Sequence, residues 1–237
     1  MKLKRFVKPR FVLLYPLALA VLLYAHTTER QLHAGIVLAL LGLALRIWAN
    51  GYVGHVKVNW TQKWRGDVRI GRLVTAGPYA FVRHPLYLGS ALIGAGMFVI
   101  AGNVWLSLLA LLFFLVVYRQ KMAEEEALLG GELGAEYLIY QAAVPRWLPS
   151  WRRYGNRQGT WRWQGILASK EWKTDIWVLV LLITLYLREE ILQEREAFFQ
   201  QMDWKHAVLV GLMAALILTD LFIECQKRWP MRSPSNA

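Results

Sequence analysis

Residues 77–89 read GPYAFVRHPLYLG and stand directly before a long apolar run. Pro85 fits the first position of a helix, where its missing N–H costs nothing, and His84 stands immediately before it. The predicted helix therefore points its N-terminus, with unpaired amides and the positive end of its dipole, at a membrane surface. Because Arg83 adds a cation at the same place, the motif favours binding of a carboxylate or a phosphate.

A second motif, the acidic cluster at residues 124–126, follows the next apolar run. Gly102-Asn103 forms a tight break between the two runs, so we expect a hairpin that returns the cluster to the level of Pro85. A carboxylate at that depth could bind an ammonium group or offset a sulfonium, and exclusion of water strengthens the pairing. Each motif alone is ordinary at a membrane boundary, and only their convergence indicates a site.

The apolar segments predict an all-α fold, a polytopic transmembrane helical bundle with about six membrane helices. They lie at residues 11–25, 34–54, 86–102, 104–120, 174–190 and 205–224. Of the 28 Lys and Arg residues, four fall in the loops on one side, namely Arg30, Arg188, Arg195 and Lys205. Because cytoplasmic loops retain the positive excess, we expect a multi-pass protein of the cell membrane with both termini and the main motif facing the cytoplasm.

Composition limits the other classes of function. The lone Cys225 excludes an intramolecular disulfide and any multi-cysteine metal site, and we expect no metal. The formal net charge of +12 could attract nucleic acid or anionic lipid. The segment 146–163 interleaves Trp with Arg, and since membrane spans flank it, we expect it to bind lipid headgroups and not nucleic acid. The sequence leaves open whether the protein is a homo-oligomer.

Four motifs in order resemble those of the isoprenylcysteine carboxyl methyltransferase family, which is similar to phospholipid N-methyltransferases. They are LVTxGPY from Leu73, RHPxYxG from Arg83, the acidic cluster, and GxEYxxY from Gly134 with Val144-Pro145 after it. The resemblance covers about residues 34–149. It implies S-adenosylmethionine as the cofactor, bound in a cytosol-facing pocket without a Rossmann domain, and the sequence has no Gly-rich fingerprint after a strand.

The resemblance also implies which residues form the site. Glu125 would bind the methionine end of the cofactor. The cofactor would further contact Leu73, Val74, Tyr79, His84, Pro85, Leu86 and Tyr87, to which the motif itself adds Arg83 for its charge and Gly89 for close backbone approach. Lys121 matches a substrate-contacting arginine of the family. Because an ammonium lacks the guanidinium fork, the nearby Arg119 is a second candidate for the head group of the acceptor.

We therefore expect residues 1–170 to form a membrane methyltransferase core with a cytosolic basic and aromatic segment. Residues 171–237 would form an accessory transmembrane or interfacial helical hairpin. The expected reaction is methyl transfer to a lipophilic acceptor, either an isoprenylcysteine-type carboxylate or a phospholipid amine. Two alternatives stay open: an NADPH-dependent reductase of the membrane sterol type, which shares an Arg-His-Pro-x-Tyr element, and a non-catalytic membrane scaffold.

Overall fold

The computed structural model describes residues 27–53, 72–169, 171–193 and 204–228. In this part of the chain we find seven α-helices, one 3-10 helix and no strand, so the predicted all-α fold is confirmed for it. The chain divides into two compact units, Met1–Ser169 and Lys170–Ala237.

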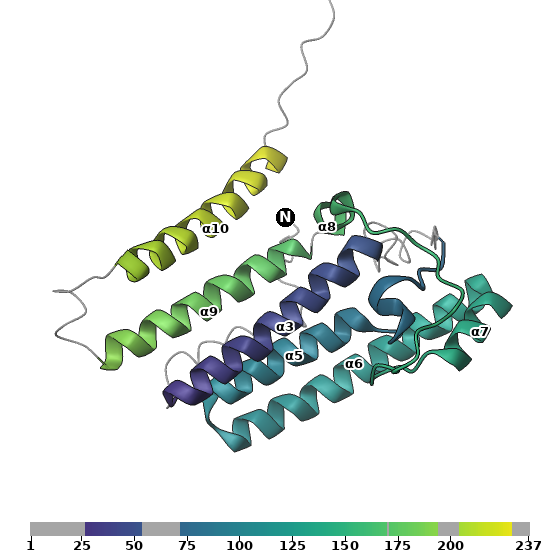
Figure 1. The fold of residues 1–237 in the computed structure, drawn as a ribbon, viewed down its shortest axis with the longest axis horizontal. Coiled ribbons are helices and arrows are strands. Elements are labelled where there is room, and N and C mark those ends of the chain that lie inside the picture. The colour runs from purple at the N-terminus through teal and green to yellow at the C-terminus, as the bar shows by residue number, and fades with distance from the viewer. Residues whose placement is uncertain (1–26, 54–71, 170, 194–203, 229–237) are drawn as a thin grey trace, which may run out of the picture. The chain divides into compact units, whose positions relative to one another are not determined.

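The first unit contains α3 (Glu29–Val53), the 3-10 helix η2 (Gly77–Ala80), α5 (Pro85–Ala101), α6 (Val104–Leu133), α7 (Ala135–Ala143) and α8 (Trp163–Ser169). Helix α5 lies between α3 and α6 and contacts both (Figure 1). It ends at Gly102, whose φ of 62° suits glycine. Helix α6 continues well past the expected end at residue 120, because strong helix formers and no proline follow. It thereby carries the acidic cluster beyond its apolar half.

Close backbone packing joins α3 to α5. A Cβ atom at Gly35 would lie 2.5 Å from the carbonyl oxygen of Gly96, and one at Gly42 would lie 2.5 Å from that of Gly89. Since no larger residue fits at such distances, these four glycines let the two antiparallel helices approach along their length. We call this contact the glycine seam. It fixes the position of α5, and therefore of the motif at its start.

The chain after α7 runs back along the main motif. We call residues 144–162 the strap. The backbone N–H of Ser150 donates to the carbonyl of Phe81 at 2.8 Å, and the N–H of Arg162 donates to the carbonyl of Gly51 at 2.9 Å. The strap therefore ties the turn before α5 to the C-terminal end of α3.

Two of the described helices are long and apolar enough to cross a membrane: α3 and the part Trp204–Ile223 of α10. Helix α5 is apolar but has 17 residues, which is about 26 Å of helix against a hydrocarbon core of about 30 Å. The predicted span at 11–25 lies outside the described residues. Within the described residues two of the six expected membrane helices meet these criteria, and the multi-pass topology with cytoplasmic termini stays a prediction.

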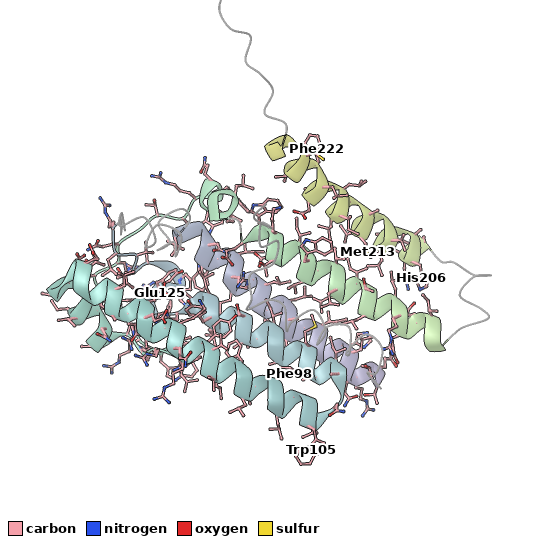
Figure 2. All side chains as sticks on the ribbon, turned by 180° about the vertical axis from the view of Figure 1, so that it is seen from behind. Phe98, Trp105, Glu125, His206, Met213 and Phe222 are labelled. Carbon is pink, nitrogen blue, oxygen red and sulfur yellow. The ribbon has the colours of Figure 1, made fainter. Side chains whose placement is uncertain are left out.

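The second unit is an antiparallel hairpin of α9 (Trp172–Gln193) and α10 (Trp204–Arg228). At one end Lys173 Nζ lies 3.1 Å from Asp220 Oδ1, and at the other His206 pairs with Glu190. Met213, labelled in Figure 2, receives a weak hydrogen bond from Thr184 Oγ1 between them. Polar contacts therefore hold the two helices in register along the hairpin.

Candidate functional site

The Arg-His-Pro motif forms the start of α5. His84 is the residue before the first turn, and its carbonyl accepts a hydrogen bond from the backbone N–H of Tyr87 at 3.1 Å. Pro85 occupies the first helical position, as predicted. Helix η2 leads into this turn from Gly77, which has φ 62° and faces Tyr52. A Cβ atom at Gly77 would lie 2.2 Å from the tyrosine ring, so only glycine fits there.

Three basic side chains surround the buried carboxylate of Glu126 on α6. His84 Nε2 lies 2.9 Å from Oε1, Arg146 Nε donates to Oε1 at 2.9 Å, and Arg83 Nη1 lies 3.4 Å from the same oxygen. Arg146 also donates through Nη2 to Oε2, which completes a two-pronged pairing. We call these four residues the Glu126 hub. The hub connects the start of α5, the C-terminal half of α6 and the strap.

The hub keeps Glu126 ionised. Burial alone would raise the pKa of Glu126, but hydrogen bonds from His84 and Arg146 and the charge of Arg83 outweigh burial and lower the pKa to about 2. The same hydrogen bond to Glu126 raises the pKa of Arg146. A carboxylate with so low a pKa is a poor proton acceptor near neutral pH. Glu126 is therefore a structural anchor.

Glu125, one residue earlier on α6, has different surroundings. The hydroxyl of Tyr87 donates to Glu125 Oε2 at 3.1 Å, and His84 Nδ1 lies 3.8 Å from that oxygen. The side chain of Glu125 is 37% exposed, against 5% for Glu126, so it retains acceptor capacity for a ligand. Figure 2 shows Glu125 towards one end of α6 and Trp105 projecting at the other. The hairpin thus brings the two motifs together, as the sequence predicts.

Four aromatic rings run from this site into the apolar half of α6. The ring centroids of His84 and Tyr87 are 5.5 Å apart, those of Tyr87 and Tyr118 are 5.1 Å apart, and Phe114 stacks on Tyr118 at 4.1 Å. We call them the ring ladder. Aromatic faces attract cations and exclude water, so the ladder makes one side of the Glu125 site both apolar and suited to a cation.

Helix α7 supports η2 from the strap side. The hydroxyl of Tyr140 donates to the carbonyl of Tyr79 at 2.7 Å, and burial raises the pKa of Tyr140. Burial also raises the pKa of Tyr137 to about 12. Both tyrosines pack with Leu73 and Val144 in one apolar cluster. The GxEYxxY motif therefore supports the fold around the site, because its tyrosines are buried and neutral.

The predicted cofactor residues fall into separate groups. Arg83, His84, Tyr87 and Glu125 come together in the Glu126 hub or beside it. Leu73, Tyr79 and Pro85 are buried, whereas Val74 and Leu86 are half-buried. Their predicted role in cofactor binding stays a prediction.

The three remaining predicted residues, Gly89, Arg119 and Lys121, are not part of the Glu126 hub. Gly89 faces α3, since a Cβ atom there would lie 2.7 Å from Arg46 Cγ and 2.8 Å from the carbonyl oxygen of Gly42. Its small size thus serves the glycine seam, and its predicted close approach to a ligand stays a prediction. On α6, Arg119 is exposed and Lys121 is half-buried. Their predicted contact with the acceptor stays a prediction.

Sequence reasoning missed the central role of Glu126 and Arg146. The chain places three glutamates in succession, and nothing in their identity indicates which one is buried. Arg146 follows directly after the Val144-Pro145 motif. The motif marks the position of Arg146 in the sequence but does not indicate that its partner is Glu126. The pairing depends on how the strap returns, which is a tertiary feature.

A cavity of about 600 Å³ lies between the C-terminal end of α3, the start of η2 and the strap. The side chains of Tyr52, Trp161 and Arg157 contribute to its lining. None of the predicted cofactor residues lines it, so a cytosolic pocket at His84 and Glu125 is not established. Among the residues that the structure describes, no group of three or more His, Cys, Asp or Glu side chains could hold a metal ion.

Comparison with known proteins supports the resemblance. Residues 30–131 match the model of the phospholipid methyltransferase family. The chain is similar to the protein-S-isoprenylcysteine O-methyltransferase of Schizosaccharomyces pombe, with 38% identity over 77 residues, which are 32% of this chain and 33% of the relative. It is also similar to the enzyme of the same name from Rattus norvegicus, with 33% identity over 116 residues, 49% of this chain and 40% of the relative.

The Mus musculus enzyme of that name is 32% identical over 115 residues, which are 48% of this chain and 40% of the relative. The chain thus spans between a third and two fifths of the length of these relatives. No solved structure matches. The matched family region contains α3, η2, α5 and nearly all of α6, including both Glu125 and Glu126, whereas Arg146 lies beyond it. The predicted likeness to both methyltransferase families is confirmed.

Proposed function

We propose that this protein is an integral membrane methyltransferase that transfers a methyl group from S-adenosylmethionine to a lipophilic acceptor at the cytosolic membrane face. The observation that carries the proposal is the contact between Tyr87 on α5 and Glu125 on α6, beside His84. It joins the two motifs for which the family resemblance implies cofactor binding. The matched family and the named relatives support methyl transfer as the type of reaction.

The chemistry of these groups fits the proposed donor. Glu125 is a partly exposed carboxylate that suits an ammonium group, and the N-terminus of α5 suits a carboxylate. The rings of His84 and Tyr87 offer flat faces to a sulfonium or a purine. When bound, S-adenosylmethionine supplies a methyl group activated by the positive sulfur. Each part of the donor thus has a matching group within this site.

The residues of the site would act by binding, alignment and exclusion of water, which in-line methyl transfer requires more than it requires acid or base groups. Tyr87 holds the Glu125 carboxylate in place, and the Glu126 hub fixes the start of α5 against α6. The ring ladder offers an apolar surface to the hydrocarbon chain of an acceptor that enters from the membrane. Lys121 or Arg119 would bind the polar head of that acceptor.

The low pKa of Glu126 helps to distinguish between the two classes of acceptor. A carboxylate acceptor is already a nucleophile at neutral pH, whereas a protonated amine must first lose a proton. The low pKa of Glu126 makes it unsuited to accept that proton. We therefore favour a lipophilic carboxylate over a phospholipid amine. The named relatives are isoprenylcysteine O-methyltransferases, which is consistent with this choice.

The rest of the chain has subsidiary roles in this proposal. The unit that begins at Lys170 would be an accessory membrane hairpin, and the Trp- and Arg-rich strap would contact lipid headgroups. A reductase would instead oxidise NADPH with a sterol or an enone. In a scaffold, substitution of Arg83, His84 or Glu125 would alter assembly and leave no turnover to lose.

The test is methyl transfer from radiolabelled S-adenosylmethionine to a total lipid extract, with the full-length protein in lipid nanodiscs. The product is identified by mass. We expect a labelled lipophilic ester with the wild type and none with His84→Ala, while Glu132→Gln, an exposed change elsewhere on α6, retains activity. A labelled product that is water-soluble contradicts entry of the acceptor from the membrane, and failure of the wild type to bind the donor contradicts the proposal as a whole.

A further inference from the structure

The side-chain amide of Asn50 is buried and forms no hydrogen bond within the described part of the fold. Its side chain is 0% exposed, and neither Nδ2 nor Oδ1 has a hydrogen-bond partner among the described residues. A buried polar group without a partner costs about 1–3 kcal/mol, so native proteins contain few of them. An apolar residue of similar size would avoid this cost. The amide therefore indicates a function other than stability.

The register of the glycine seam shows where Asn50 lies. Antiparallel packing places Gly35 against Gly96 and Gly42 against Gly89. Continued by two helical turns, the same register brings Asn50 opposite the turn between η2 and α5. The contact between α3 and η2 agrees with this position. Asn50 is therefore at the same end of α5 as His84.

The two residues that follow Asn50 on α3, Gly51 and Tyr52, face other parts of this region. A Cβ atom at Gly51 would lie 2.0 Å from Trp161 Nε1 of the strap, and the ring of Tyr52 covers Gly77. One turn earlier, Arg46 donates through Nη1 to Ser90 Oγ on α5 at 2.8 Å. Because Asn50 follows Arg46 by four residues, the two share a helical face, which is directed at the start of α5.

The amide restricts the kind of ligand. It presents a donor and an acceptor side by side, so it matches a ligand edge that offers an acceptor and a donor in the same arrangement. Adjacent donor and acceptor groups are a feature of the adenine edge, which asparagine binds through two hydrogen bonds in nucleic-acid complexes. Tyr52, two residues further along α3, and Tyr79 of η2, the element that contacts α3, are aromatic side chains of the same region, and such faces suit stacking of a purine.

We propose that Asn50 is a ligand-binding residue that hydrogen-bonds the adenine edge of the donor, on the α3 side of the α5 N-terminus. This inference rests on the proposed function. Glu125 binds the amino-acid end of the donor from α6, and Asn50 binds its base from α3. The donor then lies across the start of α5, with one recognition group on each neighbouring helix.

Two ligands allow the contributions of the base end and the amino-acid end of the donor to be measured separately. S-adenosylhomocysteine carries both the nucleoside and the amino-acid part, whereas methylthioadenosine carries the nucleoside without the amino-acid part. Binding of each is measured by calorimetry to the full-length protein in nanodiscs, for the wild type, Asn50→Ala, Asn50→Leu and Glu125→Gln. Asn103→Ala serves as the matched control, because Asn103 is exposed and lies beyond the far end of α5.

We expect both Asn50 variants to bind each ligand roughly tenfold more weakly, as loss of one or two hydrogen bonds implies. Glu125→Gln should weaken S-adenosylhomocysteine alone, and Asn103→Ala should weaken neither. Without ligand, Asn50→Leu should melt at or above the temperature of the wild type, because no unpaired amide remains buried.

Three results would overturn the inference. One is undiminished binding of both ligands by Asn50→Ala. Another is weaker binding of S-adenosylhomocysteine with unchanged binding of methylthioadenosine, since the amide would then contact the amino-acid end. The third is a lower melting temperature of ligand-free Asn50→Leu, which assigns the residue to the fold. Failure of the wild type to bind either ligand contradicts the proposed function itself, and the inference falls with it.

Discussion

The two sides of α5 are built in opposite ways. The side towards α3 carries glycines and packs backbone against backbone, whereas the side towards α6 carries Tyr87 and, just before the helix, Arg83 and His84. Tyr87 and Gly89 are two residues apart, so they point to nearly opposite faces of the helix. Shape fixes α5 on one side, and charge organises the site on the other. Substitutions on the two sides should therefore have different effects on stability and on ligand binding.

The largest effect is expected for Glu126→Gln. The change removes the charge that pairs with His84, Arg83 and Arg146, and the largely buried guanidinium of Arg83 is left without its counter-ion. Breaking a buried ion pair by removal of one partner costs about 3 kcal/mol or more. Thermal unfolding in detergent should show a clear loss of stability, while Glu132→Gln on the same helix should change nothing. Equal melting of the two variants would contradict the hub.

The hub should also make stability depend on pH. The pKa of Glu126 is lowered from 4.5 to about 2, so its contribution is fully present above pH 4.5 and is lost as the pH falls towards 2. By the size of that shift, the contribution is at most about 3 kcal/mol. We therefore expect the difference in melting temperature between the wild type and Glu126→Gln to shrink over this range. A constant difference would show that ionisation of Glu126 does not stabilise the fold.

On the α3 side, Gly42→Ala should cost about 2 kcal/mol, because its methyl group would meet the backbone carbonyl of Gly89. The matched change is Gly94→Ala on α5, whose Cβ atom would lie 3.9 Å from the ring of Phe98, in ordinary contact. Thermal unfolding of the two variants distinguishes them. If both are tolerated equally, the glycines do not set the approach of the helices.

A smaller effect is expected for Tyr87→Phe. The variant loses the hydrogen bond to Glu125 but keeps the ring contacts with His84 and Tyr118. Loss of one such bond is worth about 1 kcal/mol, or about fivefold in affinity for S-adenosylhomocysteine. The melting temperature should hardly change. A larger loss of stability than of affinity would place Tyr87 with the structural residues.

Much of the fold was predictable because apolar segments and helix boundaries are local features of the sequence. The segments expected at 34–54 and 86–102 correspond to α3 and α5, and Pro85 and Gly102 bound α5 as their backbone preferences imply. The return of the strap was not predictable, since its hydrogen bonds join residues that are far apart in the sequence. No local pattern encodes such a contact.

The assignment of roles to the glutamates had the same limit. Glu125 and Glu126 are chemically identical and differ only by about 100° of rotation around α6. That rotation directs Glu126 to Arg146 and Glu125 to Tyr87. Gly89 illustrates the same point, because its sequence context suggested a ligand whereas its helical phase turns it to α3. The position of a residue around its helix indicates its role only when the elements packed against that helix are known.

In the proposed function the two neighbouring glutamates have different roles, because Glu125 binds the donor and Glu126 stabilises the fold. The most direct test is calorimetric titration of S-adenosylhomocysteine into Glu125→Gln in nanodiscs, with the melting temperature of the same sample. We predict binding at least roughly tenfold weaker than in the wild type, as loss of a charged hydrogen bond implies, and an unchanged melting temperature. Undiminished binding, or weaker binding only together with a large loss of stability, would contradict the account.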